Sequence, residues 1–229
     1  MIDTVIDIIS KWIELVQPRK DVYTIIILTS SILLCKLTFQ KYKNASPTNQ
    51  QLMKGKTLDL FENWFKCNDK YLYSQHAIFF PNNANKNHWN LFILCNLRQI
   101  QKEDEDPFDK LTLEYEIPCI LLLDSLPAIE IFDELDLFCE MLRFNISNNK
   151  AMNPKNIKFN NKNLPLFRVK VPEQTDDIPC GYYVLRNMIG ISVSKDKVFP
   201  ILVKDFTGGD RTCDEYKAYF QTFQPLIII

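Results

Sequence analysis

The sequence predicts a single α+β domain, in which helices and strands follow one another without regular alternation and no internal repeat is present. Its 229 residues suit one medium-sized domain over residues 1–229. Hydrophobic residues make up 46% of the chain and aromatic residues 12%. This is enough for a sizeable core, so a disordered protein is excluded.

Charge and cysteine content narrow the function classes. The 27 basic and 28 acidic residues nearly cancel and include no dense Lys/Arg run, so a nucleic-acid partner is not supported. Binding through a local basic patch stays open as an alternative. The seven cysteines are odd in number and lack CxxC spacing, which indicates mostly buried free thiols in a reducing compartment. With only two histidines and no Cys/His cluster, we expect no metal and no other cofactor.

The N-terminal arm is apolar. Hydrophobic residues recur at helical spacing over residues 2–16, with Asp3 suited to a helix start and Pro18 to a stop. Residues 22–35 then form an uncharged run that ends at Lys36. Fourteen residues are too few for a membrane-spanning helix, which needs about 20. We therefore expect a buried strand that leads into another element, with a membrane anchor as the alternative.

The rest of the chain predicts further helices and strands separated by polar segments. In chain order, we expect a loop at 41–49, an amphipathic helix at 58–65, a strand at 77–80 that ends at Pro81, an Asn-rich turn at 82–87, and a strand at 89–95. There follow a charged insertion at about 99–116, a buried strand at 120–123, a helix at 129–144, a loop at 145–163, a strand at 166–171 and a buried helix at 181–189.

Cys180 is the candidate nucleophile. It follows an acidic loop at 173–177 and directly precedes Gly181 and an apolar helix. A thiol at a helix N-terminus experiences the positive end of the helix dipole, which favours the thiolate. Gly181 leaves space for a substrate backbone beside the sulfur. The alternative is that Cys180 is only a small hydrophobic residue at the start of a core helix.

Three further side chains suit acid–base chemistry. His88 lies between a polar turn and an apolar strand, where a base is held rigidly yet stays reachable; a structural or merely exposed histidine is the alternative, and His76 is a weaker candidate. Asp124 ends the run 120–123 and suits a partner that accepts the imidazole N–H, although capping the next turn together with Ser125 is an alternative role. Gln174, six residues before Cys180, suits a hydrogen-bond donor to an oxyanion or an ordinary loop residue.

In the order His, Asp, Gln, Cys, these residues resemble the Ulp/sentrin-specific family of ubiquitin-like-protein proteases. The motifs that carry the resemblance are His88-Trp89, Asp124 in LLLDSL, and Gln174 with Cys180-Gly181 in VPEQTDDIPCGYYVL. Upstream, DTVIDIISKW, the run from residue 22, Trp64-Phe65-Lys66 and FFPNNANKNHW also look similar. The resemblance covers roughly residues 3–190, and the chain from about residue 190 matches poorly.

The resemblance implies a papain-like fold, with a central mixed sheet flanked by helices. It implies a cysteine protease of the nucleus or cytoplasm that cleaves after the C-terminal Gly-Gly of SUMO or a related modifier, in conjugates or precursors. By resemblance, Cys180 attacks the carbonyl, His88 shuttles protons, Asp124 orients His88, and Gln174 with the Cys180 N–H stabilises the oxyanion. Trp89, with Gly181, would line the narrow channel for Gly-Gly. The partners are then the modifier and its conjugates, with neither nucleic acid nor membrane.

Two features depart from the family pattern. Pro179 stands where the family usually has Asp, which removes one backbone donor and restricts the residue before it. The chain also starts inside the N-terminal motif, without the Trp that the family places before it. The alternative function is therefore a catalytically impaired module of the same fold, which binds the modifier without cleaving it.

Overall fold

The computed structural model describes residues 6–8, 24–26, 29–66, 77–84, 88–97, 118–126, 132–148, 153, 156–161, 163–169, 171–174 and 179–193. Residues 6–8 are helical, as predicted for the N-terminal arm. The rest of that predicted helix, His76, the charged insertion at 99–116 and the chain after residue 193 lie outside the described residues.

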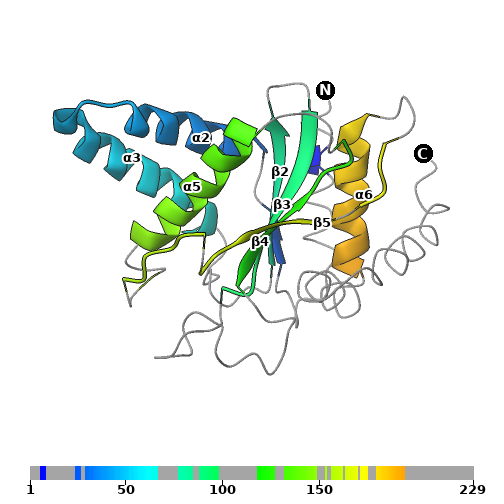
Figure 1. The fold of residues 1–229 in the computed structure, drawn as a ribbon. Helices are drawn as coiled ribbons and strands as arrows, with labels where there is room; N and C mark the ends of the chain where they lie inside the picture. The colour runs from blue at the N-terminus through cyan, green and yellow to red at the C-terminus, as the bar shows by residue number, and fades with distance from the viewer. Residues whose placement is uncertain are drawn as a thin grey trace.

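A mixed sheet of five strands forms the centre of the fold (Figure 1). The strands follow the chain order in space: β1 (Thr24–Ile26), β2 (Ala77–Ala84), β3 (His88–Cys95), β4 (Cys119–Leu123) and β5 (Leu166–Val169). The outer pairs β1–β2 and β4–β5 are parallel, whereas β2–β3 and β3–β4 are antiparallel. The predicted α+β class and mixed sheet are confirmed.

Helices cover both faces of the sheet (Figure 1). On one face lie α2 (Thr29–Lys43), α3 (Pro47–Lys66) and α5 (Phe132–Asn148), and on the other lies α6 (Cys180–Val193). Successive side chains of a strand point to opposite faces, so even-numbered residues of β2, β3 and β4 pack on the first layer and odd-numbered ones on the second. Because both faces are covered, every residue of β3 and β4 is buried and these strands are continuously apolar at their centres.

An aromatic cluster joins α5 to the sheet. The Phe138 ring of α5 lies 4.2 Å from the ring of Phe92 on β3 and 5.6 Å, edge to face, from that of Phe80 on β2. All three side chains are fully buried. This packing anchors β3, the strand on which His88 lies.

Two predicted loops are partly wrong. The loop expected at 41–49 is a short break, because α2 continues to Lys43 and α3 begins at Pro47. Proline is favoured at the first position of a helix, where its missing N–H would have no partner anyway. The loop expected at 145–163 begins later than predicted, since α5 continues to Asn148.

The strand predicted to stop at Pro81 continues to Ala84, so part of the predicted Asn-rich turn is strand. The reason is the register. β1 pairs with β2 only as far as Phe79, so beyond that point one side of β2 has no strand beside it among the described residues. A proline is tolerated on such an edge, where its missing N–H breaks no ladder bond. The added residues carry β2 alongside the first residues of β3, where His88 lies.

The apolar run at 22–35 divides into β1 and the first turns of α2, in agreement with a strand that leads into another element. In α2 the side chains of Leu33, Leu34 and Leu37 are exposed, whereas Ile32 and Cys35 are buried. None of the helices described here is both long enough and apolar enough to cross a membrane.

Candidate active site

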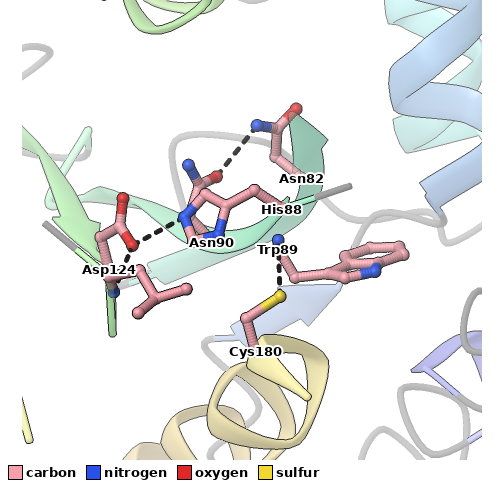
Figure 2. Close-up of polar contacts among 7 residues, drawn as sticks. Asn82, His88, Trp89, Asn90, Asp124 and Cys180 are labelled. Atoms are coloured by element: carbon pink, nitrogen blue, oxygen red, sulfur yellow. Dashed lines mark hydrogen bonds and ion pairs between the residues drawn. The ribbon is translucent and has the colours of Figure 1, made fainter. Parts of the chain in front are cut away.

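Three elements end or begin at one place and bring the predicted catalytic side chains together (Figure 2). His88 is the first residue of β3, Asp124 follows the last residue of β4, and Cys180 is the first residue of α6. β3 and β4 are antiparallel neighbours, so the beginning of one lies beside the end of the other. All three side chains are buried.

His88 and Asp124 form a buried hydrogen-bonded pair. The Nε2 atom of His88 lies 2.8 Å from Oδ1 of Asp124, and the Leu126 N–H donates to the same oxygen at 2.9 Å. The carboxylate thus combines the two roles predicted as alternatives: it binds the imidazole and caps the following turn. The second donor fixes the carboxylate, which in turn fixes the orientation of the ring.

Nδ1, the other nitrogen of His88, is buried and forms no hydrogen bond of good geometry with the described residues. The imidazole lies between the Asp124 carboxylate and the Cys180 thiol (Figure 2). Burial lowers the pKa of His88. The hydrogen bond to Asp124 and the proximity and charge of Asp124 and Cys180 outweigh burial and raise that pKa to about 9. The ring is therefore protonated at neutral pH.

The Cys180 sulfur accepts a hydrogen bond of 3.1 Å from the backbone N–H of Trp89. Burial raises the pKa of the thiol, but His88 and the N–H groups of Trp89 and Gly181 hold the pKa below that of an ordinary cysteine. Cys35 and Cys139 contrast with it, because burial raises the pKa of each to about 12. Cys180 thus has the setting of a nucleophilic thiolate paired with an imidazolium.

Comparison with known proteins shows the family to which the chain belongs. The model of the Ulp1 protease family, C-terminal catalytic domain, matches residues 1–206. The chain belongs to this family. No curated protein sequence matches the chain significantly.

Several solved structures share the Ulp1 protease fold. A de-sumoylating protease superposes with a TM-score of 0.61 and 18% identity, over 96% of this chain and 73% of that one. The C-terminal Ulp1 protease domain in complex with Smt3, the yeast ortholog of SUMO, gives a TM-score of 0.52 and 18% identity, over 89% of this chain and 76% of that one. SUMO protease Ulp1 with its catalytic cysteine oxidised to a sulfonic acid gives a TM-score of 0.53 and 18% identity, over 89% of this chain and 78% of that one.

The remaining predicted site residues lie around the Cys180–His88–Asp124 group. The Trp89 side chain is buried in the same apolar cluster as Cys180. Gly181 is buried in the first turn of α6. The Gln174 N–H donates to the Ser125 carbonyl at 2.8 Å, which ties its segment to the turn after Asp124. The role of the Gln174 side chain as an oxyanion donor stays a prediction.

Sequence reasoning missed two kinds of contact at this Ulp1-family site. The first is made by the backbone N–H group of Trp89, which carries no signal in residue type. The second is a buried row of polar side chains, Lys36, Asn82 and Asn90. Figure 2 shows Asn82 and Asn90 of this row near His88. Here a signal existed, because the two-residue period of a strand places Asn90 on the same face as His88.

Proposed function

We propose that this member of the Ulp1 family is an active cysteine protease that cleaves after the C-terminal Gly-Gly of SUMO or a related ubiquitin-like modifier. The observation that carries the proposal is the buried group Cys180, His88 and Asp124, in which the thiol pKa is lowered and the imidazole pKa is raised. Family membership and the Smt3 complex of the similar Ulp1 domain support the choice of substrate.

In the proposed reaction, the Cys180 thiolate attacks the carbonyl carbon of the terminal glycine and forms an S–C bond. The C–N bond then breaks, and its electron pair stays on the leaving nitrogen, which takes a proton from the His88 imidazolium. Water, deprotonated by His88, hydrolyses the thioester and releases the thiolate. Asp124 stabilises the imidazolium and keeps Nδ1 directed toward the sulfur.

The transition state also requires donors for the developing oxyanion. Cys180 is the first residue of α6, and the first N–H groups of a helix have no partner within the helix. We assign its N–H to the oxyanion, with the Gln174 side chain as the second donor. The Trp89 indole, beside Cys180, would cover a channel that only glycine backbone fits. This accounts for a Gly-Gly requirement.

One ground for the alternative, a modifier-binding module without turnover, is Pro179. This residue is exposed, and its carbonyl accepts the Tyr182 N–H at 2.8 Å in the first turn of α6. Proline lacks only an N–H that a helix start leaves free, so its presence is compatible with the contacts of Cys180 described above. This observation removes one objection to the active enzyme.

A modifier probe with a C-terminal electrophile tests the proposal. We expect a SUMO probe to form a covalent adduct with the wild-type protein, and Cys180→Ala to abolish the adduct while the variant still binds SUMO. Binding without adduct formation by the wild type would favour the binding module. Adduct formation that survives Cys180→Ala would overturn the assignment of the nucleophile. A panel of related modifier probes then ranks the substrates.

A further inference from the structure

A row of three polar side chains, which we name the polar chain, crosses the otherwise apolar layer between α2 and the sheet. Lys36 Nζ of α2 donates to Asn82 Oδ1 at 3.1 Å, and Asn82 Nδ2 donates to Asn90 Oδ1 at 2.9 Å. Lys36 is 5% exposed, Asn82 1% and Asn90 0%. Burying polar groups among apolar ones is unfavourable unless each finds a partner, so a buried polar row has to be explained.

The direction of the polar chain is fixed by its first member. An ammonium group can only donate, so the oxygen of the Asn82 amide must face Lys36. The Asn82 NH2 group then donates to the oxygen of Asn90, which turns the Asn90 NH2 group away from Asn82. Lys36 thus decides the orientation of both amides, which electron density alone often leaves ambiguous. The free end of the polar chain is a donor, Asn90 Nδ2.

That free end lacks a hydrogen-bond acceptor among the described residues, although its side chain is completely buried. The strand register shows which group lies nearby. Leu91 pairs with Leu123 in the antiparallel ladder, and one step further Asn90 stands opposite Asp124. Side chains of opposite residues lie on the same face of a sheet. His88 lies on this face as well, two residues before Asn90.

The Asp124 carboxylate has a second oxygen that can accept a hydrogen bond. The hydrogen bonds from His88 and Leu126 both end on Oδ1 of the carboxylate, and Oδ2 receives no hydrogen bond from the described residues. In Figure 2 the Asn90 amide nitrogen lies on the side of its side chain that faces Asp124. Hydrogen bonds of a catalytic group are often long before substrate binds and tighten in the complex.

We propose that Asn90 is a positioning residue, which donates from Nδ2 to Oδ2 of Asp124 during the reaction and so holds the carboxylate in register with His88. The inference rests on the proposed function. Lys36 and Asn82 act through Asn90, because they keep its NH2 group turned toward the carboxylate. The polar chain thereby links α2 to the catalytic pair through side chains alone.

The test compares two nearly isosteric variants, Asn90→Thr and Asn90→Val, which differ by a hydroxyl group and both suit a strand. The readout is the pH dependence of Cys180 alkylation by iodoacetamide, followed by mass spectrometry of the peptide that contains it. The ionisable groups at the site are His88, Asp124 and Cys180, which act on one another. Lys36 is the ionisable group at the far end of the polar chain. In Asn90→Val the weakened His88–Asp124 pair should raise the Cys180 pKa and slow alkylation below that pKa about 10-fold. Asn90→Thr should stay near the wild type.

Two controls separate positioning from a general loss of structure. Asn145→Leu removes another fully buried asparagine, whose Nδ2 bonds to the Met141 carbonyl in α5, and should leave the alkylation profile unchanged. In an Asp124→Asn background, Asn90→Val should have no further effect, because both changes remove the same interaction.

The proposal is overturned by an unchanged profile in Asn90→Val, by an equal shift in Asn90→Thr or Asn145→Leu, or by a full effect in the Asp124→Asn background. The smaller pair Asn90→Ser and Asn90→Ala repeats the comparison if the valine variant does not fold. Alkylation needs no modifier, so a failure of the proposed function appears in the SUMO probe assay and leaves this readout intact.

Discussion

Replacing Asp124 by asparagine should lower the pKa of His88 by a large, measurable amount. The substitution keeps the shape of the side chain and removes its charge. The Asp124 carboxylate makes a 2.8 Å hydrogen bond to His88, and this bond is the largest of the influences that raise the pKa of the ring. Without the carboxylate charge, only burial, which lowers the pKa of His88, and the influence of Cys180, which raises it, remain.

The magnitude follows from the pKa itself. A rise from 6.5 to about 9 corresponds to about 3 kcal/mol of preference for the protonated ring. Losing most of that preference lowers the equilibrium constant for protonation of the ring on the order of 100-fold. We therefore expect the pKa of His88 to fall well below 9 in Asp124→Asn, and kcat/KM on a SUMO substrate to fall about 100-fold.

Proton NMR can follow this change directly, because the chain has only two histidines. A His76→Gln variant assigns the remaining C2–H resonance to His88. Cys180→Ala serves as the control. In this variant the pKa of His88 should fall less than in Asp124→Asn, because Asp124 is the stronger partner of the ring. The reasoning is refuted if His88 of the wild type titrates near 6.5, or if Asp124→Asn leaves its pKa unchanged.

Three other predictions concern the pH range, the thiols and the core. Turnover should decline as pH rises through about 9, since the His88 proton needed by the leaving amine is then lost, and the alkaline limb of kcat against pH measures this. At pH 7.5 iodoacetamide should modify Cys180 far faster than Cys35 or Cys139, whose thiols have a pKa of about 12; equal rates by peptide mass spectrometry would contradict this. Phe138→Ala should lower the free energy of unfolding in urea by about 3–5 kcal/mol, because it removes a fully buried ring, and a loss below 1 kcal/mol would contradict the packing described.

Elements with a strong local signal could be predicted from the sequence. The apolar run before Asp124 and the apolar spacing after Cys180 predict β4 and α6 within a residue or a few of their observed bounds. The C-terminal end of β2 and the start of α3 could not be predicted in the same way, because both involve prolines. Pro81 is tolerated since β1 stops at Phe79, and that is a fact of strand pairing, which residue type does not reveal.

Some features of the candidate site could likewise be predicted from the sequence, whereas others could not. The residue types and order of His88, Asp124 and Cys180 indicated a catalytic group, and the fold brings these three together. The Trp89 N–H on the sulfur depends on how α6 approaches β3, which follows only from the packed structure. Asn90 could be placed on the face of His88 from the strand period, but its relation to Asp124 requires the β3–β4 register.

Hydrolysis of a SUMO C-terminal amide that carries a fluorescent leaving group tests the central claim most directly. The account predicts saturable release of the fluorophore after Gly-Gly by the wild-type protein, and none by Cys180→Ala at equal SUMO binding. A wild-type protein that binds SUMO and releases no fluorophore above the rate of Cys180→Ala would contradict the account.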